Sequence, residues 1–352
     1  MQRFSSIDAL RGLTVAAMLL VNGAGDWGHV YGFLEHASWH GSTPADFIFP
    51  FFLVIVGVSL SLAFTPKLTQ APALLLRAIV WRGVKIIALG VALHVLADVL
   101  IPGREFRLLG VLQRIGVGFV VVGSLFVLVR RAVLLYGLFA AILLGYWGLL
   151  LWGGSYDPHL NIVDRFDTRW LGSLAYSYDA ATGLAQEPEG LLSSVPAWAS
   201  IMMGLQAAHC LRHQQRGRLL VLGVLAMGLG ALWSLVLPMN KQLWTPSFVL
   251  WTGGFAYLLI ALAHELIDRR GLPAIGVSFG VNAIFAYAGS WVLTCVLAAT
   301  GGQDWIYTNV FTAWLTPVWG AYMSSMAFAL VMTLLFGAVV WWLRRRHWRF
   351  SI

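Results

Sequence analysis

Ten apolar segments dominate this sequence, and their length is the strongest constraint on its fold. A helix needs roughly 20 apolar residues to cross the hydrocarbon core of a bilayer, and the ten segments approach or reach that length. They predict ten membrane-spanning helices, over residues 10–25, 47–64, 84–101, 108–128, 132–152, 191–210, 219–237, 245–265, 275–298 and 321–343. The Trp-bearing segment 306–320 contains Pro317 and is too short to span, so we expect it to lie along the outer interface.

The composition agrees with a membrane protein. Hydrophobic residues make up 59% of the 352 residues and charged residues only 11%, whereas about 25% charged residues is usual in soluble domains. The 17 tryptophans and 10 tyrosines suit the headgroup level at both faces of a bilayer. We therefore predict an all-α integral membrane protein, a bundle of about ten transmembrane helices plus a short interfacial helix, in a single polytopic domain over residues 1–352.

The Lys and Arg residues gather in alternate connections. Basic residues are enriched in cytoplasmic loops, and placing both termini in the cytoplasm puts most of the 23 Lys and Arg residues on that side. The net charge of +8 therefore reflects membrane topology, and we expect no nucleic-acid partner. No small-residue cleavage signal follows the first apolar segment, so we expect this segment to be retained.

This orientation places the first connection, residues 22–50, on the extracytoplasmic side. Its ionisable groups are unusually dense for a link between two helices; they are Asp26, His29, Glu35, His36, His40 and Asp46. Such groups at a membrane face are candidates for function, although a surface histidine is the ordinary alternative for His36. A histidine can take a proton from an attacking amine or hydroxyl at neutral pH. Asn22 can donate a hydrogen bond to an oxygen, and Asp46 opens the second span.

The longest connection, residues 153–190, lies on the same predicted side. It is rich in Asp and Glu and long enough to cover a site, but the favoured expectation for most of its residues is an acidic, solvated loop. The chain has no HExxH or P-loop sequence. Zinc-protease and ATPase chemistry therefore have no motif to support them.

Polar residues inside or beside the predicted spans add further candidates. Asp8 and Arg11 are three residues apart on one helix face, where an ion pair and a ligand-binding role are equally plausible. Arg114, next to Gln113, lies within a span and needs a partner or water, which favours a functional role. Lys241 and Trp244 open the eighth span, where the usual role of such residues is to anchor a helix at the interface.

Six blocks in order along residues 5 to about 290 carry a resemblance to a known family. They are IDALRGL, HASWHGSTPADFIFPFFLVIVGVS, LGVLQRIG, EGLLSSVPA, KQLWTPSFVLWTGG and GVNAIFAY. Together they resemble the catalytic region of the heparan-α-glucosaminide N-acetyltransferase family. The resemblance implies acetyl transfer across the membrane, from cytoplasmic acetyl-CoA to a glucosamine-type amino sugar on the far side, in a multi-pass protein of the bacterial inner membrane.

The resemblance also implies roles for individual residues. The histidine of the HASW block, His36, matches the catalytic histidine, and Asn22 matches the asparagine at the outer end of the preceding span. Two departures stand out: the chain lacks the extra N-terminal region and span of the animal enzyme, and its connection from Asn22 to His36 is longer. His40 stands where the animal enzyme has an asparagine, which leaves the identity of the acceptor open.

Geometry adds an expectation about the coenzyme. The hydrocarbon core is about 30 Å thick, so acetyl-CoA bound from the cytoplasm has to thread into the bundle to bring its thioester near His36. We expect a polar cavity open to the cytoplasm with basic residues at its mouth and polar residues deeper; the candidates are Arg11, Arg82 and Lys85 at the mouth and Gln113 and Arg114 inside. No metal is expected. His36 acts as general base or carries an acetyl-histidine intermediate, and the sequence leaves both open.

The remaining candidates concern the acceptor. Asp46 joins His36 and Asn22 as a catalytic residue, and the residues expected to bind the sugar are Asp26, His40, Lys241 and Trp244. Expected partners are acetyl-CoA, the sugar and membrane lipid, and a homo-oligomer is possible. The alternative function is an inner-membrane transporter for an amino sugar or its oligomers. The absence of an inverted repeat in the sequence, and polar groups gathered at one face, lean against a transporter.

Overall fold

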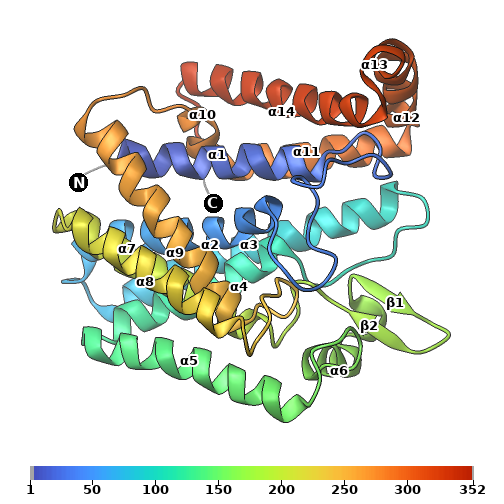
Figure 1. Ribbon diagram of the computed structural model, residues 1–352. Helices are drawn as coiled ribbons and strands as arrows, with labels where there is room; N and C mark the ends of the chain where they lie inside the picture. The colour runs from blue at the N-terminus through green and yellow to red at the C-terminus, as the bar shows by residue number, and fades with distance from the viewer. Residues whose placement is uncertain (1–3, 351–352) are drawn as a thin grey trace.

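The computed structural model describes residues 4–350 as a bundle of helices that run along one another (Figure 1). Each of the ten predicted segments contains a helix, which agrees with an all-α membrane protein. These helices are α1 (Ser5–Asn22), α2 (Ile48–Phe64), α3 (Pro72–Leu100), α4 (Val111–Leu128), α5 (Ala132–Gly153), α7 (Ser194–Arg212), α8 (Arg216–Trp233), α9 (Pro246–Ala263), α11 (Ala283–Ala299) and α14 (Ala321–Arg345).

The prediction of ten spans is too high when the helices are judged by their length and composition. Seven helices of the described chain are long and apolar enough to cross a membrane, and an eighth span results if α11 and the bent segment after it count as one. The helices α1 and α7 fall short because they carry polar side chains. In α7, 13 of the 19 residues are buried, so this helix meets protein on most sides and does not need an apolar surface.

The centre of the bundle is the contact between α2 and α7. A Cβ atom added at Gly57 would lie 1.9 Å from the Ile201 carbonyl oxygen, and one added at Gly204 would lie 2.0 Å from the Val54 carbonyl oxygen. The two backbones therefore touch, as small residues permit in membrane helices. Any larger side chain at either glycine would force these helices apart.

A sharp bend follows α11. The chain continues as α12 (Gly302–Ile306), a π-helical turn (Tyr307–Thr312) and α13 (Ala313–Trp319), a segment inclined by 87° to α11. Trp305, Trp314 and Trp319 are all exposed on it. An apolar helix across the end of the bundle, with exposed indole rings, fits the predicted interfacial helix.

The connection 153–190 is folded, and the expectation of a solvated loop is wrong for its key residues. It contains α6 (Ile162–Trp170) and the antiparallel strands β1 (Ser177–Asp179) and β2 (Leu184–Gln186). Four of its carboxylates are buried, and each accepts a hydrogen bond from a backbone or charged group that offsets the cost of burial; they are Asp164, Asp167, Glu187 and Glu189.

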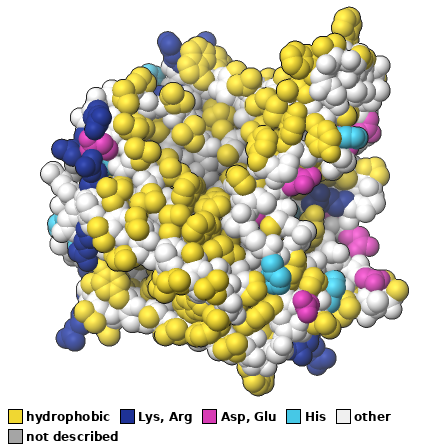
Figure 2. Space-filling model, in the orientation of Figure 1, with side chains coloured by type: hydrophobic (Ala, Val, Ile, Leu, Met, Phe, Trp, Pro, Cys, Tyr) yellow, Lys and Arg dark blue, Asp and Glu magenta, His cyan; other side chains and the backbone are white. Residues whose placement is uncertain are grey.

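The remaining elements are short. They are the 3₁₀ turns η1 (Pro44–Phe47), η2 (Thr65–Lys67) and η3 (Gly172–Leu174), the π-helical turn His264–Arg269 after α9, and α10 (Val277–Val281). In Figure 1 the first connection lies at the same end of the bundle as α6 and the two strands. In the face shown in Figure 2, most Lys and Arg side chains lie at the opposite end and most Asp and Glu side chains at this one. The membrane orientation stays a prediction.

Candidate active site

Asp46 is the most firmly held side chain of the first connection, residues 22–50. It lies in η1, directly before α2, where Pro44 and the Thr43 side chain start the turn with a capping box. Its carboxylate is completely buried, and Oδ2 accepts hydrogen bonds from the backbone N–H groups of Ala37 (3.1 Å) and Thr43 (3.0 Å). A buried carboxylate with several donors is held rigidly. The connection therefore folds around Asp46.

His36 is held by the other oxygen of the same carboxylate. Its Nδ1 lies 2.8 Å from Asp46 Oδ1, while 44% of its side chain stays exposed. A carboxylate next to one ring nitrogen selects the tautomer with the proton on that nitrogen. The Nε2 atom of His36 is then an acceptor, so the pair has the arrangement of an oriented general base.

Lys241 reaches the same pair from the other half of the chain. Its Nζ lies 3.1 Å from Nδ1 and 3.2 Å from Nε2 of His36, and 3.5 Å from Asp46 Oδ1. Near-equal distances to both ring nitrogens place the ammonium against the face of the imidazole. Burial lowers the pKa of Lys241, and the nearby carboxylates of Asp46 and Glu189 oppose this shift.

A tight turn before α9 positions Lys241. The Asn240 side chain accepts a hydrogen bond from the Leu243 N–H (2.8 Å), and the Asn240 N–H donates to the Thr245 hydroxyl (3.0 Å). Trp244 has φ +51°, a left-handed conformation that is rare for a bulky side chain. Such strain persists only where the surroundings fix it, so the turn is a rigid support for Lys241.

A cavity of about 110 Å³ lies against this group. Its polar lining comes from five separate segments: Asn22 at the end of α1, His36, Glu189 before α7, Lys241, and Tyr287 of α11. The fold thus brings Asn22, His36 and Lys241 to one cavity. Their roles there stay a prediction. A second cavity, of about 230 Å³, shares Asn22 and Tyr287 as walls.

Sequence reasoning missed Glu189, which lines the cavity at His36. Its carboxylate forms an ion pair with Arg107, which also pairs with the buried Glu187. Burial alone would raise the pKa of Glu189, but the positive charges of Arg107, Arg114 and Lys241 outweigh burial and lower that pKa. The cavity therefore contains an ionised carboxylate at neutral pH. The only sequence signal was its place in the EGLLSS block, directly before α7.

Three residues predicted to bind substrate lie outside the cavity. Asp26 is paired with His29 (2.7 Å), a hydrogen bond that lowers the Asp26 pKa. His40 is exposed, with its Nδ1 3.4 Å from the Asn240 amide. Trp244 is 1% exposed and lies in the turn that supports Lys241, so its side chain is not at the surface of the cavity.

The two predicted polar residues of α4 are also buried within protein. Arg114 donates to the Gly190 carbonyl (3.3 Å) and to Ser193, and its guanidinium lies 5.0 Å from the centre of the Trp244 ring. Gln113 donates to the Leu108 carbonyl (3.0 Å). Arg114 thus joins the segment carrying Glu189 to the turn carrying Lys241, and neither α4 residue lines the cavity at His36.

The basic residues predicted to hold the coenzyme lie away from His36. Arg11 is paired with Asp8 (3.2 Å), as its spacing predicted, and donates to Ser59 on α2 (2.8 Å). Arg82 stacks on Phe119 at 5.1 Å, with a buried Nε that has no hydrogen-bond partner. Lys85 is exposed. In residues 4–350 no group of three His, Cys, Asp or Glu side chains is arranged to hold a metal ion.

Asp167 gives the folded connection a pH-dependent stability. Burial raises its pKa from 3.8 to about 7. The folded state therefore keeps a proton that the unfolded chain loses above pH 4, so the free energy of unfolding should fall by roughly 4 kcal/mol between pH 4 and pH 7 and level off above. Thermal unfolding of the wild type and of Asp167→Asn in detergent checks this expectation. The variant should lose most of that slope, and equal slopes in both proteins would contradict it.

Comparison with known proteins identifies the family of this chain. The family model described as the catalytic region of heparan-alpha-glucosaminide N-acetyltransferase matches residues 3–219. The human protein named heparan-alpha-glucosaminide N-acetyltransferase is 27% identical over 351 residues, covering 82% of this chain and 52% of the relative. The mouse protein of that name is 29% identical over 359 residues, covering 83% and 54%. The chain spans about half the length of the curated relatives it matches. It belongs to the heparan-alpha-glucosaminide N-acetyltransferase family.

Proposed function

We propose that this chain is a membrane acetyltransferase that moves the acetyl group of cytoplasmic acetyl-CoA to a glucosamine-type amino sugar at the opposite face, in a bacterial inner membrane. The observation that carries the proposal is the cavity where His36, oriented by Asp46, faces Asn22 and Glu189. The names of the matched relatives support the reaction class. A base, an amide donor and a carboxylate around one small cavity are the groups that acyl transfer to an amine requires.

In the proposed reaction, the amine nitrogen of the sugar attacks the thioester carbonyl carbon. A C–N bond forms, the C–S bond breaks, and the coenzyme leaves as a thiolate. His36 Nε2 takes the proton that the nitrogen loses and passes it to the sulfur. Asp46 keeps the imidazole in the correct tautomer and stabilises its charged form. Proton transfer by a positioned base typically contributes about 10²–10⁴-fold to the rate.

Two donors are placed to stabilise the oxyanion that forms on the carbonyl. The Asn22 amide ends α1 at the cavity wall, and the Lys241 ammonium is already fixed beside His36. Donors that are held in place before the reaction cost no reorganisation in the transition state. Removal of one such donor typically slows a reaction by about 10²–10³-fold.

We assign the adjoining 230 Å³ cavity to the sugar. It shares Asn22 and Tyr287 with the small cavity and adds Arg104, whose guanidinium lies 4.8 Å from the centre of the Trp291 ring. An aromatic face beside polar donors is suited to a sugar ring. The coenzyme has to arrive along the bundle from the other end: Arg11 and Asn22 are eleven residues apart on α1, about 16 Å along its axis.

The decisive experiment is acetyl transfer by the purified protein in detergent. Radiolabelled acetyl-CoA is offered with glucosamine, glucosamine-terminated oligosaccharides and their hydroxyl analogues. Label on the amino sugars but not on the hydroxyl analogues would support the proposal and define the acceptor class. Protein that binds acetyl-CoA saturably yet labels none of these acceptors would overturn the assignment to amino sugars.

Glu189 should set the affinity for the amine. In the Glu189→Gln protein we expect the KM for the amino sugar to rise about tenfold, because hydrogen bonds to charged groups contribute roughly 1.5–3 kcal/mol. The KM for acetyl-CoA should not change. Steady-state kinetics with each substrate varied separately measures both values.

Glu187→Gln is the matched control for this prediction. Glu187 pairs with the same Arg107 but does not line either cavity. If disturbance of Arg107 caused the effect, both variants would raise the KM for the sugar. A change confined to Glu189→Gln supports a direct contact with the amine.

A further inference from the structure

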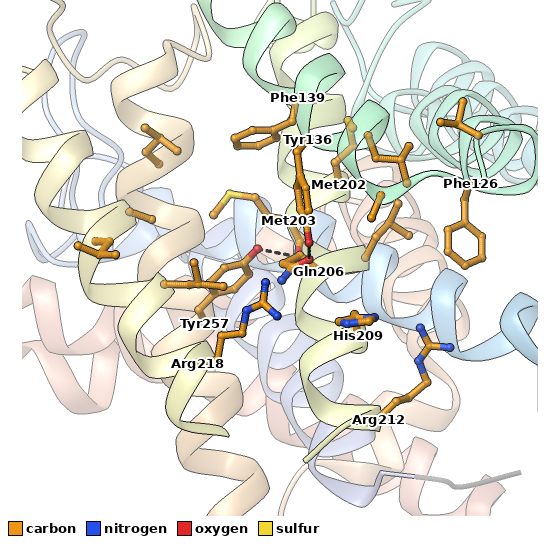
Figure 3. A pocket seen from close by; sticks show the side chains of 18 of the residues that line it. Phe126, Tyr136, Phe139, Met202, Met203, Gln206, His209, Arg212, Arg218 and Tyr257 are labelled. Carbon is orange, nitrogen blue, oxygen red and sulfur yellow. Dashed lines mark hydrogen bonds between the residues drawn. The ribbon is translucent and has the colours of Figure 1, made fainter. Parts of the chain in front are cut away.

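A cavity of about 590 Å³ lies between α5 on one side and α7, α8 and α9 on the other. Its walls are mostly apolar, with the side chain of Phe139 in the upper part of the view and those of Met202 and Met203 below it (Figure 3). Tyr136 of α5 crosses it and donates a hydrogen bond to Gln206 of α7. The cavity is therefore an apolar space that the Tyr136–Gln206 hydrogen bond crosses.

This space is separate from the candidate active site. No residue that lines it also lines the cavity at His36 or the adjoining 230 Å³ cavity. The helix α7 stands between them, because it packs against α2 through Gly204 and turns Met202 and Gln206 towards the large cavity. The proposed acetyl transfer leaves the large cavity without a role.

Positive charge gathers at one end of the cavity. Arg212 and Arg218 line it together with His209, at the lower end of the view in Figure 3, and Arg130 joins them from the end of α4. Within residues 4–350 none of the three arginines forms an ion pair with a carboxylate. The neighbouring Arg216, in contrast, pairs with Glu265. Three guanidinium groups beside an apolar space leave charge for an anion.

The depth of the cavity matches one leaflet of a bilayer. Arg212 and Met202 are ten residues apart on α7, about 15 Å along the axis, and Arg218 and Leu229 are eleven apart on α8, about 16 Å. Half of the roughly 30 Å hydrocarbon core is the same length. A molecule with its charge at the arginines would place its apolar part along the full cavity.

We propose that this cavity binds an anionic phospholipid, with an acyl chain between α5 and α8 and the phosphate at Arg130, Arg212 and Arg218. Charge complementarity selects an anionic headgroup over a zwitterionic one. The chain would fill a space that otherwise separates α5 from its neighbours, so the lipid would join α5 to the bundle. This proposal is independent of acetyl transfer.

Native mass spectrometry of the whole protein tests the proposal. The protein is released from micelles that contain dioleoyl phosphatidylglycerol or dioleoyl phosphatidylcholine in equal amounts, and retained lipid is counted. We expect the wild type to retain phosphatidylglycerol selectively. The Arg212→Gln/Arg218→Gln protein should bind it more weakly by about fivefold for each arginine, the factor expected for one basic residue at an anionic surface.

Two further variants keep the test specific. Arg77→Gln removes an exposed basic residue of α3 outside the cavity and should retain lipid as the wild type does. Ala226→Trp, which fills the cavity from α8, should reduce retention while circular dichroism stays helical. Equal retention of both lipids, unchanged retention in the double variant, displacement of the lipid by palmitoyl-CoA, or a dimer contact that closes the cavity would each overturn the proposal.

Discussion

The His36→Ala protein is expected to lose acetyl transfer by about 10³-fold or more, because His36 is the one imidazole among the described residues that line the cavity. Binding of acetyl-CoA should stay nearly intact. His36 is 44% exposed and contributes little packing, so the fold should survive its truncation. Transfer is measured with radiolabelled acetyl-CoA, and coenzyme binding by equilibrium titration of the same preparation.

The chain offers a closely matched control for this variant. His29 lies in the same connection, pairs through Nδ1 with Asp26 at 2.7 Å, and is 45% exposed, but it does not line the cavity at His36. His29→Ala should transfer acetyl groups at close to the wild-type rate. Equal loss of transfer and of coenzyme binding in His36→Ala would instead indicate that this histidine supports the structure.

The same preparations separate the two mechanisms for His36. A general base never carries the acetyl group, whereas a nucleophilic histidine forms a covalent acetyl-imidazole. Incubation of the wild type with labelled acetyl-CoA and no sugar, followed by rapid denaturation, should leave no label on the protein if His36 is the base. Label that is retained by the wild type and missing from His36→Ala would show the covalent route.

The sequence predicted the helices well because a long apolar run leaves few other structures. All ten runs contain a helix, but the number that can face lipid is smaller. Whether a helix meets lipid or protein depends on its neighbours, and α7 is covered by contacts that are distant in the sequence, such as Gly204 against Val54. From local composition alone, α1 and α7 were predicted to span the membrane like the more apolar helices around them.

The site was predictable where its residues lie close in the sequence. His36 and Asp46 are ten residues apart in one connection and were assigned together. Lys241, 205 residues from His36, was named as a candidate but without a partner. Glu189 was missed, because an acidic residue in a long loop is usually solvated. Its burial depends on Arg107, a pairing across 82 residues that no local pattern reveals.

That pairing leads to the largest stability effect we expect. Arg107 is the counter-ion of both Glu187, which is 2% exposed, and Glu189, which is 9% exposed. Arg107→Met would remove the ion-pair partner of two buried carboxylates, which typically costs about 3–5 kcal/mol. The free energy of unfolding in mixed micelles should fall by that amount. Arg104→Met is the control: Arg104 lies three residues earlier and stacks on Trp291 instead of pairing with these carboxylates, so its loss should lower the free energy of unfolding much less.

Two measurements distinguish a loss of stability caused by uncompensated charge in Arg107→Met from one caused by lost packing. Adding Glu187→Gln and Glu189→Gln to Arg107→Met removes the uncompensated charge, so the triple variant should recover most of the lost stability. The Arg107→Met defect should also shrink as the pH falls below the range in which these carboxylates ionise, because protonation neutralises them. If neither charge removal nor acid restores stability, Arg107 acts through its contact with Tyr176. In that case, the carboxylate beside His36 is positioned by other contacts.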